Sequence, residues 1–98
     1  MNAKIQSARL DRLFEAVLRL EKIDECYNFF EDLCTVPELK ALTQRFHVAE
    51  LLVSGMVYSD IVKATGASSA TISRVNRALN LGSDGYKNVI GKLAAGKK

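Results

Sequence analysis

The side chains best suited to chemistry lie between Tyr58 and Leu79, in the stretch YSDIVKATGASSATISRVNRAL. Short hydroxyl and methyl side chains come first, and arginines follow at positions 74 and 77. Hydroxyls bind phosphate oxygens, small side chains let a helix approach base edges, and arginine can bind a phosphate or a guanine edge. This combination predicts contact with double-stranded DNA. The predicted DNA-binding residues are Tyr58, Lys63, Ser68, Ser69, Ala70, Thr71, Ser73, Arg74 and Arg77.

Two short helices and a tight turn would position these side chains. The first helix should begin near Val57 or Tyr58, with a poor cap, and direct Ile61 and Val62 inward. Gly66 permits the backbone conformation of the turn, and a serine two residues later is a good N-cap.

The second helix has one apolar face and one polar face. Its predicted buried stripe is Ile72, Val75 and Leu79, and the opposite face carries small polar residues and both arginines. Residues 80–82 end it. A second helix of this kind is typical of a helix-turn-helix that enters the DNA major groove.

The distribution of charge agrees with this interpretation. The chain of 98 residues has a net charge of +3. Residues 1–50 carry seven basic and nine acidic residues, whereas residues 51–98 carry seven basic residues and only Asp60 and Asp84 as acids. The half that contains the helix-turn-helix is therefore the positive one, as a surface that faces phosphates requires.

Four more helices are expected. Residues 7–20 and 23–34 have apolar residues at helical spacing. Thr35 and Glu38 can form a capping box that starts a third helix, and Gly55 suits its end. The last helix covers about 84–94. No strand pattern is present, so the predicted fold class is all-α with six helices. The expected apolar stripe of the third helix is Leu39, Leu42, Phe46, Ala49 and Val53, widened by Leu51 and Leu52.

The length predicts a single domain over residues 1–98. Residues 7–54 would form mainly the dimerisation and core helices, 57–80 the helix-turn-helix, 84–94 a C-terminal helix and 95–98 a tail. The several apolar helix faces exceed what one small core can bury, which suggests burial shared between two chains. With no signal peptide and no membrane-spanning run, a cytoplasmic protein is expected.

Catalytic and metal-binding patterns are absent from the sequence. If Cys26 and Cys34 lie on one helix they are about 12 Å apart, too far for a disulfide bond, and they are expected to be buried apolar thiols. One histidine, His47, and no Cys-x-x-Cys pair make a zinc site improbable. We therefore expect neither an enzyme nor a bound metal or cofactor.

The segment ATGASSATISRVNRAL resembles the helix-turn-helix of the Trp repressor superfamily. The chain as a whole, including the preceding FFEDLCTVPELKALTQRFHVAELLVSGMVYSDI, is similar to its YerC/YecD-like branch. The resemblance covers roughly residues 8–94 and is strongest from Leu33 to Leu79. It implies a six-helix fold and an intertwined homodimer in which the N-terminal helices of two subunits interlock. Such a dimer would read two half-sites about 34 Å apart, one turn of DNA.

The resemblance also implies a pocket for an effector, because the founding member of the family binds tryptophan. Val75 stands here in place of a glycine that leaves room for the indole ring, and Ala78 replaces a serine that binds the amino acid. Asp32 replaces a leucine of the pocket. We therefore expect that tryptophan does not bind. The vestigial effector pocket would comprise Thr35, Arg45 and Arg74.

These observations predict a homodimer that binds double-stranded DNA sequence-specifically and regulates transcription as a repressor-like protein. Two alternatives stay open. One is a helical module for protein–protein interaction, and the other is a regulator that responds to an unknown small-molecule effector.

Overall fold

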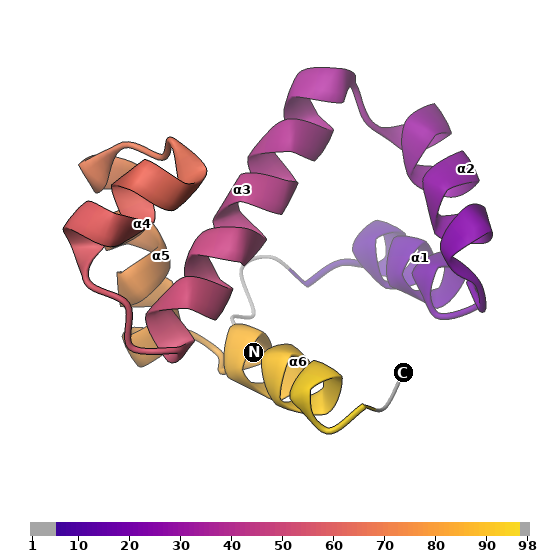
Figure 1. The fold of residues 1–98 in the computed structure, drawn as a ribbon. Coiled ribbons are helices and arrows are strands. Elements are labelled where there is room, and N and C mark those ends of the chain that lie inside the picture. The colour runs from indigo at the N-terminus through magenta and orange to yellow at the C-terminus, as the bar shows by residue number, and fades with distance from the viewer. Residues whose placement is uncertain (1–5, 97–98) are drawn as a thin grey trace. The chain divides into compact units, whose positions relative to one another are not determined.

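The computed structural model describes residues 6–96, which form six helices and no strand (Figure 1). The predicted all-α class is therefore confirmed. The first helix ends at Val17, three residues before the predicted end, and residues 97–98 of the predicted tail lie outside the described range. No helix in the described range is long and apolar enough to cross a membrane. The helices are α1 (Ala8–Val17), α2 (Ile23–Leu33), α3 (Val36–Val53), α4 (Tyr58–Thr65), α5 (Ser69–Leu81) and α6 (Gly85–Ala94).

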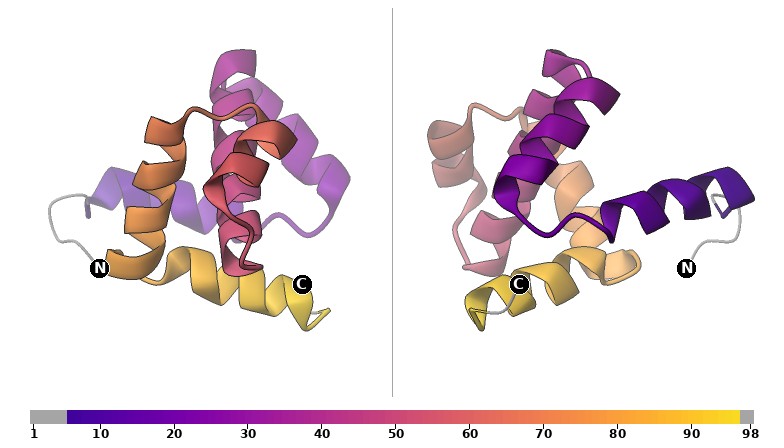
Figure 2. Two further views of the ribbon diagram at one scale, coloured as in Figure 1. Left: turned by 60° about the vertical axis from the view of Figure 1, so that its left-hand side comes forward. Right: turned by 90° about the vertical axis from the view of Figure 1, so that its right-hand side faces the viewer.

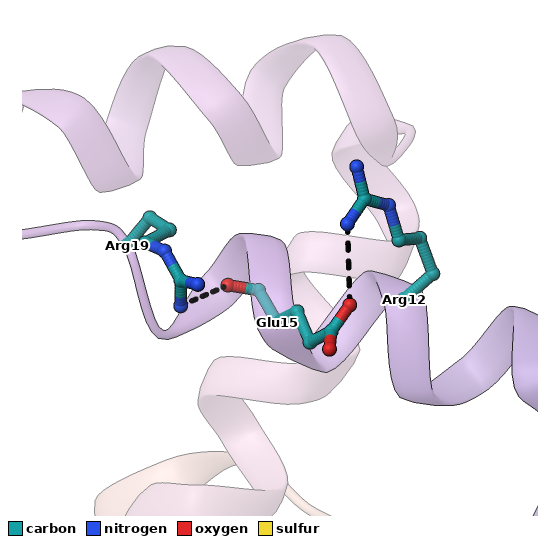
Figure 3. Close-up of polar contacts among 3 residues, drawn as sticks. All are labelled: Arg12, Glu15 and Arg19. Atoms are coloured by element: carbon teal, nitrogen blue, oxygen red, sulfur yellow. Dashed lines mark hydrogen bonds and ion pairs between the residues drawn. The ribbon is translucent and has the colours of Figure 1, made fainter.

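The chain divides into two compact units between Leu39 and Lys40. In the first unit, Ser7 caps α1 by accepting a hydrogen bond from the backbone N–H of Leu10 at 3.0 Å. Figure 3 shows the polar face of α1, where Arg12 forms an ion pair with Glu15 at 3.3 Å. Arg19, in the turn after the helix, donates to the backbone carbonyl of Glu15 at 3.4 Å. These contacts are exposed and stabilise the helix only modestly.

The predicted capping box at the start of α3 is confirmed. The backbone N–H of Thr35 donates to the Glu38 carboxylate at 2.8 Å, and the backbone N–H of Glu38 donates to the Thr35 hydroxyl at 3.2 Å. The pKa of Glu38 lies below its ordinary value of 4.5, chiefly because the backbone N–H of Thr35 donates to the ionised carboxylate and secondly because of the Thr35 side chain. One of the two bonds of the capping box, from the Thr35 N–H to the carboxylate, is therefore charge-assisted.

No residue of α1 or α2 is buried. Large apolar side chains are instead exposed on both helices, including Leu18 at 76% just after α1, and Ile23 at 73% and Tyr27 at 65% on α2. Cys26 and Cys34 are free thiols, but they are half-buried and not buried as expected, and Cys34 lies just beyond the end of α2. The first unit thus contains amphipathic helices without a core of its own.

The second unit contains the core of the described chain. Helices α4, α5 and α6 gather around the second half of α3 (Figures 1 and 2). Leu51, Leu52, Met56, Tyr86 and Ile90 pack against the core from outside. The buried cluster consists of Val48, Ala49, Ile61, Ala67, Ile72 and Val75.

Two predictions about this core are wrong in part. On α3, Ala49 of the predicted stripe is buried, but Leu42 and Val53 of that stripe are 42% and 48% exposed, and the second buried residue is Val48, which the stripe did not include. Helix α3 carries apolar residues on more than one side, so the pattern alone did not identify the side that packs against α4 and α5. Val62 is 40% exposed, because the residue after the buried Ile61 lies about 100° further around the helix.

The end of α3 confirms the role predicted for Gly55, which has a positive φ of 90°. The N–H of Met56 donates to the carbonyl of Leu51, and that of Gly55 donates to the carbonyl of Leu52. This pair of bonds is a Schellman motif, which turns the chain sharply toward α4.

Candidate nucleic-acid interface

The turn between α4 and α5 is fixed by hydrogen bonds from both sides. Gly66 ends α4 in the left-handed conformation at φ 71°, as predicted. The Thr65 hydroxyl donates to the carbonyl of Ile61 at 2.7 Å and accepts from the N–H of Ala67 at 3.1 Å. From α3, the Gln44 amide donates to the carbonyl of Thr65 at 3.3 Å. The angle at which α5 leaves the turn is therefore set by the core helix.

The inner face of α5 is anchored as the sequence predicts. Ile72 and Val75 are 0% and 1% exposed, and Leu79 is also buried. They belong to the same helix as the candidate DNA-binding residues, so the opposite face of α5 must point away from the core.

That opposite face is free of negative charge. No acidic residue occurs on α5, and neither Arg74 nor Arg77 forms an ion pair within residues 6–96. The short side chains lie on the first two turns, where backbone N–H groups at the helix N-terminus favour an anion. Arg74 lies on the second turn and Arg77 on the third. Five of the candidate residues are exposed together here: Ser69, Ala70, Ser73, Arg74 and Arg77.

Ser68 and Thr71 have a different setting from these five. The Ser68 hydroxyl caps α5 by accepting the N–H of Thr71 at 3.1 Å, which confirms the predicted cap. The same hydroxyl donates to the Thr71 hydroxyl at 3.1 Å, and Thr71 is only half exposed. Both hydroxyl groups therefore already form hydrogen bonds within the first turn of α5.

Tyr58 and Lys63 are both exposed on α4, at its first and last turns. Lys63 follows Tyr58 by five positions, which is about 140° around a helix after the full turn is subtracted, so the two side chains do not share a face. The structure therefore does not bring Tyr58 and Lys63 together, and each is a separate candidate contact.

The residues of the predicted effector pocket fall in different units. Thr35 belongs to the first unit and is engaged in the capping box, whereas Arg45 and Arg74 belong to the second. Beside Arg74 lies an open hollow of about 360 Å³, and Arg45 does not line it. Val75 faces the core instead of this hollow. The lining residues are Arg74, Arg77, Ala78, Leu81 and Gly82.

Two contacts near the interface escaped prediction from the sequence. Gln44 and Thr65 are 21 residues apart, and no local sequence pattern predicts the hydrogen bond between them. On α5 the Asn80 amide donates to the carbonyl of Asn76 at 2.9 Å and to its side-chain oxygen at 3.0 Å. The spacing of four residues between two asparagines could have indicated this second contact.

The six-helix fold and the exposed second helix of the motif define an all-α protein that contains a helix-turn-helix. A family profile described as Trp repressor protein matches residues 8–94. The chain therefore belongs to the Trp repressor family, a family of DNA-binding regulators.

The similarity to other proteins covers nearly the whole chain. The uncharacterized protein YerC of Bacillus subtilis is 47% identical over 90 residues, which are 92% of this chain and 86% of YerC. A TrpR-like protein from Eubacterium eligens has a similar structure, with a TM-score of 0.91 and 50% identity over 95% of this chain and 96% of that one. A putative Trp repressor from Staphylococcus aureus also has a TM-score of 0.91, with 46% identity over 96% and 95% of the two chains.

Proposed function

We propose that the chain is a cytoplasmic, homodimeric transcription regulator of the repressor type that reads the DNA major groove with α5. The exposed face of α5 carries this proposal, since small side chains at the N-terminal turns are followed by Arg74 and Arg77 without any acidic residue. Small residues permit close approach to base edges, and each arginine can add a phosphate or guanine contact.

The proposed homodimer is supported by apolar surface in both units. The first unit has no buried residue on α1 or α2, so its apolar faces need a partner. The second unit has an open apolar hollow of about 620 Å³ between α3, α5 and α6, lined in part by Phe46, Tyr86 and Val89. In a dimer, α1 and α2 of one copy can cover the apolar hollow in the second unit of the other copy.

Charge complementarity supports the same partner. Residues 1–39 carry five basic and eight acidic residues, a net charge of −3, whereas residues 40–98 carry nine basic and three acidic residues, a net charge of +6. Contact between the first unit of one copy and the second unit of another would therefore bring opposite charges together.

The function is tested by selecting bound sequences from a random pool of duplex DNA. We expect an enriched site with two half-sites about 34 Å apart, centre to centre. The double variant Arg74→Ala, Arg77→Ala should remove specific binding, whereas the control Lys87→Ala, Lys92→Ala on α6 removes the same charge and should retain it. Affinity should also fall steeply between 50 and 200 mM salt. In a plot of the logarithm of the binding constant against the logarithm of the salt concentration, each phosphate contacted should steepen the slope by about 0.9.

Three results would oppose this proposal. A pool without enrichment would exclude sequence-specific recognition, and equal affinity of the two double variants would exclude α5 as the reading element. Affinity for a protein partner that is insensitive to salt, with no DNA binding, would favour an interaction module instead.

A further inference from the structure

A polar hollow lies between α3 and α4 in the second unit, outside the exposed face of α5. Its volume is about 430 Å³. Lys40, Gln44 and His47 follow one another at helical spacing along one side of α3, and no acidic residue lines the hollow. The remaining lining residues are Thr43, Ala64 and Thr65.

Three carbonyl groups of α3 and α4 near this hollow already accept side-chain hydrogen bonds. The last turn of a helix presents carbonyl groups with partial negative charge. Here the carbonyl of Thr65 accepts from the Gln44 amide at 3.3 Å, and that of Ile61 accepts from the Thr65 hydroxyl at 2.7 Å. On α3, the carbonyl of Lys40 accepts from the Thr43 hydroxyl at 2.9 Å.

Three side-chain donors of the lining have no hydrogen-bond acceptor within residues 6–96. They are the ammonium group of Lys40, a ring N–H of His47 and the second amide hydrogen of Gln44. One positive charge with neighbouring N–H donors is the set that binds a single phosphate group in protein–DNA interfaces.

The hollow also lies close to the end of α5 that would enter the groove. Thr65 precedes the N-cap Ser68 by three residues, so the two are at most about 11 Å apart along an extended chain. The major groove is about 12 Å wide and is bounded on both sides by phosphates. A helix end in the groove therefore has backbone phosphates within reach of this hollow.

We propose that the hollow between α3 and α4 binds a backbone phosphate of the DNA whose groove receives α5. This extends the interface from the helix-turn-helix to the core helix α3, and it rests on the proposed function. Because Gln44 also fixes the turn before α5, the same side chain links the phosphate contact to the position of the recognition helix.

A matched pair of substitutions at Ala64 tests the site. Ala64 is exposed on the floor of the hollow, so a larger side chain can be accommodated without disturbing the core. Ala64→Glu places a carboxylate where the phosphate would lie, and Ala64→Gln adds the same bulk without charge. At 50 mM salt we expect Ala64→Glu to bind the selected duplex about tenfold more weakly than Ala64→Gln. Equal affinities of the two variants would overturn the proposal.

The salt dependence of binding gives a second readout. Lys40→Ala should make the logarithmic salt slope shallower by about 0.9, with the loss of affinity uniform across DNA sequences. Lys92→Ala, which removes a lysine of α6 that does not line the hollow, should leave the slope unchanged. If both variants change the slope equally, the effect belongs to overall charge, and the phosphate site is wrong.

Inorganic phosphate distinguishes a free anion from the DNA backbone. We expect 10 mM phosphate at constant ionic strength to leave the melting temperature of the free protein unchanged. A rise that disappears in Lys40→Ala, with wild-type DNA affinity retained, would assign the hollow to a free anion and overturn this proposal. Absence of DNA binding by the wild-type protein would instead reject the proposed function itself.

Discussion

Ser68 and Thr71 are joined by two hydrogen bonds at the first turn of α5. The Ser68 hydroxyl accepts the backbone N–H of Thr71 and donates to the Thr71 hydroxyl, both at 3.1 Å. The hydroxyl proton of Ser68 is therefore already used in a hydrogen bond within the protein, and toward DNA this hydroxyl can only accept a hydrogen bond. Ser69 and Ser73 have no such bond within the described residues, so in the proposed interface they are the better hydroxyl donors toward DNA.

The first prediction separates capping from DNA binding at Ser68. Ser68→Ala should lower the free energy of unfolding by about 1 kcal/mol, because the first turn of α5 loses its cap. Ser68→Asp should keep the cap and the stability, but its negative charge at the groove should weaken DNA binding. Urea denaturation and a DNA-binding titration measure the two effects. Equal stability of wild type and Ser68→Ala would show that the cap contributes nothing.

The second prediction concerns the close approach of α5 to the turn that follows it. A Cβ atom at Gly82 would overlap the backbone carbonyl of Ala78, which cannot move without breaking the last turn of α5. Gly82→Ala should therefore destabilise the protein by about 1–3 kcal/mol.

Gly91 provides the matched control for this substitution. It lies inside α6, where an added methyl group would meet no atom within 4 Å, so Gly91→Ala should stabilise by about 0.5–1 kcal/mol through helix propensity. Thermal or urea denaturation measures both. Similar effects of the two substitutions would contradict the predicted clash at Gly82.

The third prediction tests the proposed dimer through α1 and the turn after it. Leu18 is 76% exposed, so Leu18→Glu should lower the free energy of unfolding of a single chain only slightly. If a second copy covers this side chain, the new carboxylate must be buried or the dimer must dissociate. Sedimentation velocity should show a mass shift from dimer toward monomer, with reduced stability. Ala16→Glu, on the polar face beside Arg12 and Arg19, should remain dimeric. Dimers of unchanged stability in both variants would exclude an interface at Leu18.

Features determined by near neighbours were predictable from the sequence. The Ser68 cap, the capping box of Thr35 and Glu38, and the positive φ of Gly66 each depend on at most four consecutive residues. Side-chain chemistry and backbone sterics decide such features locally. The six helices and the exposed face of α5 follow for the same reason.

Features that depend on distant partners were not predictable. Helix α3 has apolar residues on several sides, and only its packing against Ile61 and Ile72 selects Val48 and Ala49 for burial. The bond from Gln44 to Thr65 and the hollow beside it require two helices to meet. No periodicity within one helix contains that information.

The fourth prediction follows from the lowered pKa of Glu38. A carboxyl whose pKa is lowered by folding stabilises the protein above its unfolded pKa of about 4.5, and this contribution disappears as the pH falls through the folded value. Glu38→Gln keeps the hydrogen-bonding shape without the charge. Its melting temperature should therefore be lower than that of the wild type at pH 6, and the two melting temperatures should converge at strongly acidic pH. Melting temperatures measured from pH 7 to pH 2.5 test this.

A second variant tests the origin of that shift. Thr35→Ala removes the hydroxyl but retains the backbone N–H, whose hydrogen bond is the larger cause of the lowered pKa. Its stability should keep most of the acid dependence of the wild type. Loss of the whole dependence in Thr35→Ala would mean that the hydroxyl, and not the backbone, holds the carboxylate.

The fifth prediction is that tryptophan does not bind. Val75 is 1% exposed and packs in the core with Ile72 and Ile61, so its side chain fills space that a glycine would leave open. Ala78 offers no hydroxyl to the amino group of a ligand. A ligand at 100 times its dissociation constant stabilises a protein by about 2.7 kcal/mol, which a thermal scan detects easily. In 1 mM tryptophan we therefore expect no change in melting temperature, no saturable heat in calorimetry and unchanged DNA affinity. A saturable heat would mean that the side chain of Val75 moves out of the core to admit the indole ring.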